Sequence, residues 1–167
     1  MKRIVIADAS ALIALAKIDH LFILQGLFGE VWLAPTVLAE LRLAEFAASG
    51  SALQVALDAA WLRVNPSTNA NAVLTGLDAG ETESILQALH AQSTGDAVLL
   101  IIDEQTGRAA AKELGLTIAG TVAVIGMAKQ RGLIPSARVV FDALLKTDFR
   151  ISAAIIRQVL ANVGEIV

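Results

Sequence analysis

An unbroken apolar run, Ala97–Ile102, stops abruptly at Asp103. Successive side chains of a strand point to opposite faces of its sheet, so a strand that is apolar at every position is buried on both faces. Such strands are typical of parallel sheets that helices cover on both sides. Ile4–Ala7 is a second short apolar run, and it ends in the same way at Asp8. We therefore predict an α/β fold with a covered sheet.

Strand-like and helix-like segments alternate along the whole chain, and Gly, Pro and N-cap residue types set the boundaries of the helices. We predict strands at 4–7, 31–34, 61–64, 97–102 and 117–119, with 61–64 at an edge. We predict helices at 9–17, 20–28, 35–48, 52–60, 79–91, 106–114, 121–131, 136–146 and 152–162. The alternation predicts one domain over 1–167, a three-layer α/β/α sandwich around a central parallel sheet of four to five strands. The C-terminal helices, about 136–163, either pack on this domain or form a dimer or partner interface.

The composition is apolar for a chain of 167 residues, with 56% hydrophobic residues and a mean hydropathy of +0.66. Every stretch of about 18 apolar residues is broken by a charge, which argues against a membrane span. Because monomers seldom expose large apolar patches, we expect a homodimer or an obligate partner. Asp8 interrupts the first apolar segment, so we expect no export signal and a cytoplasmic location. The lack of cysteine excludes disulfides and thiolate metal sites.

Charge is distributed unevenly along the chain. Residues 1–103 carry 5 Lys/Arg and 11 Asp/Glu, whereas residues 104–167 carry 8 Lys/Arg and 5 Asp/Glu. The basic excess of the second part is available for phosphate contacts. The net charge of −3 argues against nonspecific coating of nucleic acid and favours a substrate held locally.

Asp8 and Asp103 each follow a predicted strand. In open α/β sheets, ligands bind in the crevice beyond the carboxyl ends of the strands. If the two strands are neighbours, the two carboxylates lie within a few ångströms and their repulsion calls for a cation. The alternative is that each aspartate simply caps the helix that follows it.

Two glutamates are candidates to complete this site. Glu40 lies on the shoulder of the buried stripe of the helix at 35–48, so it either reaches the crevice or stays a solvated flank residue. Glu81 and Glu83 point about 200° apart on their helix, so only one of them faces the site. Glu81 lies nearer the inner face and the helix start, and we favour it. Asp78 and Glu81 also fit the capping-box pattern, which offers Glu81 a different role.

The candidate ligands are all carboxylates, and hard oxygen donors favour Mg²⁺ or Mn²⁺ over zinc. Such ions polarise a phosphodiester, lower the pKa of a bound water and stabilise the leaving oxygen, so no side-chain nucleophile is needed. Consistent with this chemistry, the sequence contains no Gly-rich phosphate loop, nucleophile elbow or Ser/His/Asp arrangement.

Five segments spread over nearly the whole chain carry a family resemblance: IVIADASALIALAKI, APTVLAEL, LDAGETESI, LLIIDEQTGR and GTVAVIGMAKQRGLI. In this order they resemble the PIN-domain nuclease superfamily, and in particular its bacterial and archaeal subgroup associated with toxin-antitoxin modules. The resemblance implies an α/β/α sandwich and Mg²⁺- or Mn²⁺-dependent cleavage of RNA. It also implies regulation by a small antitoxin protein that covers the site.

The resemblance also assigns the four acids. Asp8 matches the acid that ends the first strand, and Asp103 matches the acid that ends the central strand. Glu40 matches the helix glutamate, and Glu81 matches the third acid. These four residues are the implied catalytic and metal-binding residues.

Five further residues have supporting roles in this comparison. Ser10 and Thr121 match nearby hydroxyl positions, where they orient ligands or waters or serve as N-caps. Glu104 replaces what is often a second aspartate after the central strand. Arg108 and Lys112 are candidate phosphate contacts on the helix leaving the site, and the alternative is that they are solvated helix charges.

Two other classes of protein compete with a nuclease. The first is a catalytically silent PIN-like module that binds a protein or RNA without cutting it. The second is an aspartyl-phosphate enzyme of haloacid-dehalogenase type, in which an acid at the end of the first strand is the nucleophile. This class fits less well, because Ser10 stands where such enzymes place a second aspartate.

Overall fold

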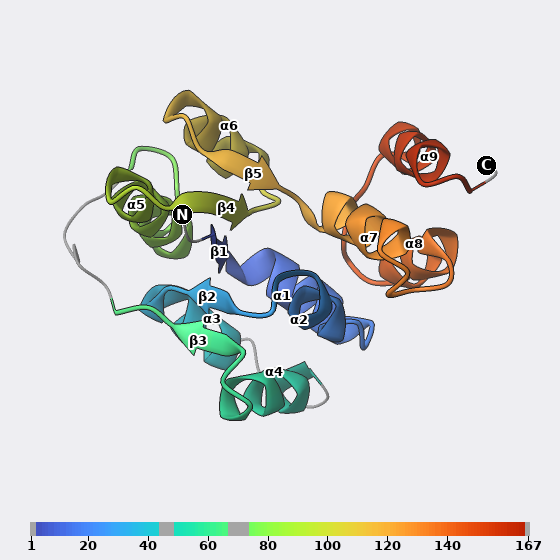
Figure 1. The fold of residues 1–167 in the computed structure, drawn as a ribbon, viewed down its shortest axis with the longest axis horizontal. Helices are drawn as coiled ribbons and strands as arrows, with labels where there is room; N and C mark the ends of the chain where they lie inside the picture. Colours follow the sequence, from blue (N-terminus) through green and yellow to red (C-terminus); the bar gives the residue numbers. More distant parts are fainter. Residues whose placement is uncertain (1–2, 44–48, 67–73, 166–167) are drawn as a thin grey trace.

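A computed structural model describes residues 3–43, 49–66 and 74–165. Across these residues the strands are β1 (Arg3–Ala7), β2 (Val31–Leu33), β3 (Leu62–Val64), β4 (Ala97–Ile101) and β5 (Thr117–Ala119). The helices are α1 (Ala9–Lys17), α2 (Phe22–Phe28), α3 (Pro35–Leu43), α4 (Ser49–Asp58), α5 (Ala79–Ser93), α6 (Gln105–Glu113), α7 (Thr121–Gln130), α8 (Ala137–Leu145) and α9 (Ala153–Asn162). Helices cover both faces of the sheet, which confirms the predicted α/β/α sandwich (Figure 1).

The strands form one parallel sheet in the order β3-β2-β1-β4-β5. The strands at 4–7 and 97–102 are therefore neighbours, and β1 pairs with β4 from Arg3↔Ala97 to Ala7↔Ile101. The chain leaves β1 toward β2 and β3, then crosses to β4 and β5 on the other side. This reversal of strand order lies between β1 and β4, and such a point is where a crevice opens at the carboxyl edge of a sheet.

Side chains of β1 and β4 alternate between two hydrophobic cores. Val5 and Ile101 belong to the larger core, which α1, α2 and α7 complete. Ile6 and Leu100 belong to the smaller core beneath α5 and α6. All four residues are at most 3% exposed. Burial of each such side chain contributes about 1.5–3 kcal/mol, which offsets the cost of holding polar groups at the sheet edge.

The C-terminal helices pack on α7, on the side toward which the β4 and β5 arrowheads point in Figure 1. Val140 and Leu144 are part of the core, whereas Val139 and Ile155 are exposed. Gly126 permits the close approach of α9, because a Cβ there would lie 2.9 Å from Val159 Cγ1. The inner faces of α8 and α9 therefore belong to the domain. Their role as a dimer or partner interface stays a prediction.

The predicted element boundaries agree with the structure to within a few residues, as expected for helix ends. The strand predicted at 61–64 is the edge strand β3. The helix predicted at 52–60 lies at Ser49–Asp58. The last part of the helix predicted at 35–48 lies outside the described residues, which include α3 to Leu43. In the part of the chain that the structure describes, no helix has the length and apolar character needed to cross a membrane.

Candidate metal centre at the carboxyl edge of the sheet

Asp8 lies at the end of β1, where its backbone N–H donates to Ile101 O at 2.9 Å and so fixes it beside β4. It occupies the N-cap position of α1, but its side chain makes no capping hydrogen bond. The carboxylate is 5% exposed, and its Oδ1 has no hydrogen-bond partner among the described residues. Capping therefore does not account for Asp8, because a buried carboxylate oxygen without a partner costs free energy.

Asp103 follows β4 and is oriented by the start of α7. Its Oδ1 accepts from the Thr121 backbone N–H at 2.8 Å, and its Oδ2 accepts from Thr121 Oγ1 at 2.6 Å. Gly120 makes this approach possible, since a Cβ there would lie 2.9 Å from Asp103 Oδ1. Asp103 does not cap α6, whose N-cap is Glu104. The interpretation of Thr121 as an N-cap was wrong, because Gly120 has that position and the Thr121 hydroxyl is bonded to Asp103.

Glu40, on α3, is half-buried and faces the first turn of α5. A backbone hydrogen bond from Gly80 holds its carboxylate. A Cβ at Gly80 would lie 2.5 Å from Glu40 Oε1, so a larger residue there would require the Glu40 carboxylate to move. The shoulder position predicted for Glu40 thus places it against α5 rather than in solvent.

Glu81 divides its two oxygens between two roles. The predicted capping box is confirmed: Glu81 N–H donates to Asp78 Oδ1 at 2.7 Å, and Asp78 N–H donates to Glu81 Oε1 at 3.5 Å. Glu81 Oε2 is buried without a hydrogen-bond partner among the described residues, and a Cβ at Gly107 would lie 2.6 Å from it. Glu83 is engaged elsewhere, because its Oε1 accepts from the N–H and Oγ1 of Thr36.

The electrostatics of these acids are those of a crowded site. Burial, opposed in part by a hydrogen bond from the backbone of Ala9, raises the pKa of Asp8 from 3.8 to about 7, and the charges of Asp78, Glu40 and Asp103 add to the rise. The pKa of Glu81 is also raised, by burial and then by its side-chain hydrogen bond with Asp78. Burial likewise raises the pKa of Glu40 and of Asp103. Each of the four predicted acids therefore resists ionisation.

Asp78 is the acid that the sequence analysis treated only as a helix cap. Its charge raises the pKa of Asp8, Glu40 and Glu81, so it belongs to the same cluster. Its place in the sequence LDAGETES, near Glu81 and two residues before the glycine that contacts Glu40, was the available signal.

The donor set fits a hard divalent cation. Asp8 and Glu81 each present a buried carboxylate oxygen that lacks a protein partner within the described ranges, and such oxygens are the ligands that Mg²⁺ and Mn²⁺ prefer. No group of three or more His, Cys, Asp or Glu residues among those described has the spacing of a formed metal site. The charges of Asp78, Glu40 and Asp103 act on Asp8, but the acids among the described residues do not form a complete coordination shell.

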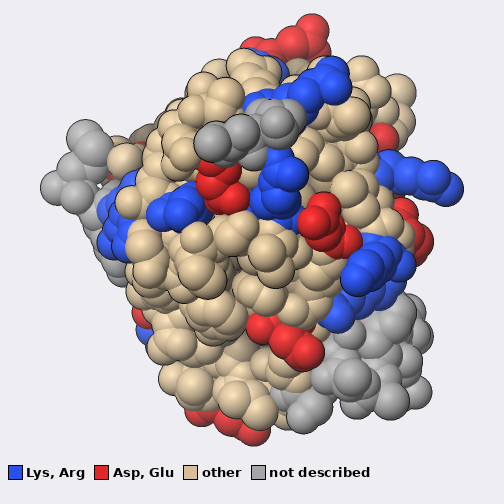
Figure 2. Space-filling model, turned by 90° about the vertical axis from the view of Figure 1, so that its right-hand side faces the viewer, with Lys and Arg blue, Asp and Glu red and all other residues tan. Residues whose placement is uncertain are grey.

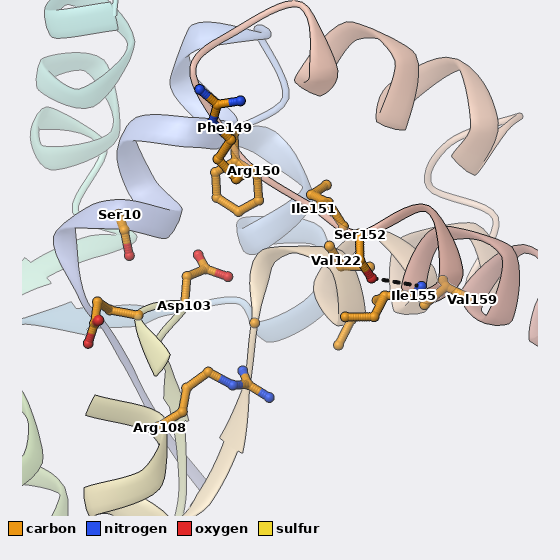
Figure 3. A pocket seen from close by; sticks show the side chains of 13 residues that line it. Ser10, Asp103, Arg108, Val122, Phe149, Arg150, Ile151, Ser152, Ile155 and Val159 are labelled. Carbon is orange, nitrogen blue, oxygen red and sulfur yellow. Dashed lines mark hydrogen bonds between the residues drawn. The ribbon is translucent and has the colours of Figure 1, made fainter. Parts of the chain in front are cut away.

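Ser10 and Arg108, two of the predicted supporting residues, lie on either side of Asp103 (Figure 3). The interpretation of Ser10 as an N-cap is wrong because Asp8 has that position, and the alternative role of Ser10 in orienting ligands or waters stays a prediction. Its Oγ is buried without a partner among the described residues, in the wall of a cavity that Asp103 and Arg108 share. Arg108 Nη1 donates to Ile102 O at 3.0 Å.

Two of the predicted supporting residues lie outside the cluster. The Glu104 carboxylate accepts from the Gly107 N–H at 3.1 Å and so caps α6, although Glu104 also lines the cavity. Lys112 is exposed one turn beyond Arg108 and does not line the cavity. Of the two predicted phosphate contacts, only Arg108 faces the site.

The parallel sheet, with its strand order reversed between β1 and β4, places the chain among the open α/β proteins, which have a crevice at the carboxyl edge of the sheet. The chain belongs to the PIN-domain family, because residues 4–165 match that family. The fold is similar to that of a PilT N-terminus domain protein from the archaeon Sulfolobus solfataricus. The TM-score is 0.51 at 15% identity, over 89% of this chain and 99% of the archaeal chain. Among curated proteins, none matches the chain.

The family match confirms the resemblance predicted from the five segments. PIN domains form a nuclease superfamily whose members typically use divalent metals. Of the acid cluster, Asp8 and Asp103 lie at the carboxyl ends of β1 and β4, the edge of the sheet at which open α/β proteins bind their ligands.

Proposed function

We propose that this protein is a Mg²⁺- or Mn²⁺-dependent endoribonuclease that hydrolyses phosphodiester bonds in RNA. The observation that supports this most directly is Asp8, whose buried carboxylate has an unpartnered oxygen and three acidic neighbours. A fold that only needed a helix cap would not leave such an oxygen unsatisfied. A divalent cation removes both the repulsion and the missing coordination.

Asp8, Glu40, Glu81 and Asp103 are the residues that would hold the ion. When bound, the ion supplies Lewis acidity toward a phosphodiester and lowers the pKa of a water molecule. Thr121 keeps Asp103 in one orientation through its N–H and hydroxyl. Arg108, fixed by its bond to Ile102 O, offers guanidinium donors to a phosphate beside Asp103.

The cellular role that we infer is that of the toxin-like component of a toxin-antitoxin module. The support is the resemblance of the five sequence segments to the toxin-associated subgroup of PIN domains. A homodimer and a small antitoxin protein are the partners that this role predicts.

The test is incubation of the purified protein with a panel of RNAs in Mg²⁺, Mn²⁺ or chelator. We expect internal cleavage that requires the metal and is lost in Asp8→Asn. The matched control is Asp58→Asn, an exposed aspartate on α4 that is bonded to Gln54. Equal behaviour of wild type, Asp8→Asn and Asp58→Asn under every condition would contradict the proposal.

The second candidate is a catalytically silent PIN-like module that binds RNA or protein. The observation in its favour is the lack of a formed three-ligand metal site among the described residues. Calorimetric titration with Mn²⁺ separates the two candidates. A nuclease binds Mn²⁺ through Asp8 and loses this binding in Asp8→Asn, whereas the silent module shows no metal binding that depends on Asp8.

A further inference from the structure

The cavity beside Asp103 has two chemically different walls. It has a volume of about 500 Å³, within the roughly 300–1,000 Å³ typical of small-ligand sites. Ser10, Asp103 and Arg108 form the polar wall next to the acid cluster, and Glu104, Arg150 and Ser152 are the other polar residues of the lining. Phe149, on the connection between α8 and α9, and Ile155, on α9, contribute to the apolar wall. Figure 3 shows the Phe149 ring turned toward Ser10 and Asp103, with Arg108 reaching in from the opposite side.

We propose that this cavity is a nucleotide subsite in which Phe149 stacks on an unpaired base of the substrate while Arg108 holds an adjacent phosphate. This inference rests on the proposed nuclease function, because the substrate chain must pass the acid cluster that the cavity adjoins. A nucleotide matches both walls: its base is a flat π-surface, and its phosphate is an anion. Phe149 and Arg108 are thus positioning residues for single-stranded RNA.

The connection that carries Phe149 is held in place by its own hydrogen bonds. Thr147 Oγ1 donates to Leu144 O at 2.6 Å and accepts from the Phe149 N–H at 3.2 Å. Lys17 Nζ contacts Asp148 Oδ1 at 2.9 Å and so ties the connection to α1. An aromatic ring on a fixed backbone loses less conformational freedom on binding than one on a mobile loop.

The surface charge also favours recognition of a single nucleotide in a local subsite over binding of nucleic acid to a broad basic surface. The face over the C-terminal helices carries interspersed Lys/Arg and Asp/Glu rather than a field of one sign (Figure 2). Such a face gives little attraction to the regular backbone of a duplex. Base stacking requires an unpaired nucleotide, so the subsite selects single strands.

Binding experiments in chelator test the subsite without cleavage. The probes are a short fluorescent single-stranded RNA and an abasic ribose-phosphate oligomer of the same length, measured by anisotropy. We expect Phe149→Leu to weaken RNA binding roughly 5- to 100-fold, the loss of one stacked base, and to leave abasic binding unchanged. Phe149→Trp retains the stacking and therefore the affinity. Arg108→Gln weakens the binding of both probes alike, because it removes a phosphate contact.

Phe22→Leu is the matched control, since Phe22 is half-exposed on α2 and does not line the cavity. The subsite is overturned if wild type does not bind the RNA, if Phe149→Leu binds like wild type, or if it weakens both probes equally. The last result would mean that Phe149 only supports the fold. Base-dependent binding without any metal-dependent cleavage would refute the nuclease while leaving the subsite in place. Metal-dependent cleavage with no effect of Phe149→Leu on RNA binding would refute the subsite and leave the proposed nuclease function in place.

Discussion

Glu165 and Asp8 show two ways in which this fold treats a carboxylate. Glu165 accepts hydrogen bonds from Ser136 Oγ and from the N–H groups of Ala137 and Arg138, and so caps the start of α8. These bonds outweigh the effect of burial and lower the pKa of Glu165. Asp8 is buried with an unpartnered oxygen, and its pKa is raised.

We interpret this difference as that between a structural carboxylate and one that we propose binds a ligand. Where a negative charge completes the fold, backbone and side-chain donors surround it. At the carboxyl edge of β1 and β4, Asp8 is buried with one backbone hydrogen bond, from Ala9, and with the charges of Asp78, Glu40 and Asp103 nearby. A site of this kind is destabilising until something else neutralises it, and the family of the chain makes a divalent cation the natural candidate.

The largest expected effect is on catalysis. Asp8→Asn should lower RNA cleavage by about 1,000-fold, about 4 kcal/mol of transition-state stabilisation. Glu165→Gln should leave the cleavage rate unchanged, since Glu165 lies at α8. Single-turnover rates in Mg²⁺ make this comparison, and equal losses in the two variants would erase the distinction between the carboxylates.

The second prediction concerns pH and stability. Because the folded-state pKa of Asp8 is about 7, the folded protein binds this proton more tightly than the unfolded chain does. Without metal, stability should therefore fall as the pH rises from about 4 to about 7, by up to about 4 kcal/mol from Asp8. Urea unfolding in chelator measures this slope, which should flatten in Asp8→Asn.

Mg²⁺ supplies the complementary measurement. A cation that binds ionised carboxylates should raise the melting temperature more at pH 8 than at pH 5, because protons compete at the lower pH. A Mg²⁺ effect that is independent of pH, or is retained in Asp8→Asn, would place the ion elsewhere.

The third prediction concerns the glycines that pack against the acids. A Cβ at Gly80 would lie 2.5 Å from Glu40 Oε1, the end of a flexible side chain, so Gly80→Ala should displace the Glu40 carboxylate at a cost of about 1 kcal/mol. In the Glu40→Ala background the clash is gone, and Gly80→Ala should become neutral or stabilising by about 0.5–1 kcal/mol. The double-mutant cycle is measured by urea unfolding. The same cost in both backgrounds would show that Gly80 has another structural role.

The sequence predicted the sheet and the position of the acids because both depend on local signals. An unbroken apolar run indicates a strand that is buried on both faces. The acid that follows the run indicates the carboxyl edge of a parallel sheet. Asp8 and Asp103 were therefore found together, and the pairing of β1 with β4 confirms their placement at one edge.

What escaped prediction depends on tertiary contacts. The close approach of Gly107 to Glu81 joins α6 to α5, and no periodicity along either helix reports it. Phe149 lies in a short connection between helices, far in sequence from the acids that share its cavity. The N-cap interpretation of Ser10 failed because hydroxyl residues near a helix start usually serve as caps, whereas Asp8 takes that position here.

The smallest effect is expected at Glu165. Glu165→Gln keeps the size of the side chain but weakens the charge-assisted bonds to the start of α8, so it should cost about 1 kcal/mol. Because the pKa of Glu165 is lowered on folding, its stabilisation is present above its ordinary pKa and is lost as the pH falls through the folded-state value. Asp8 has the opposite dependence, since its contribution to stability worsens as the pH rises. Urea unfolding of wild type, Glu165→Gln and Asp8→Asn at pH 3 and pH 8 measures how each substitution changes the dependence of stability on pH. If the two substitutions change this pH dependence in the same direction, both carboxylates are structural, and the assignment of Asp8 as a ligand would be wrong.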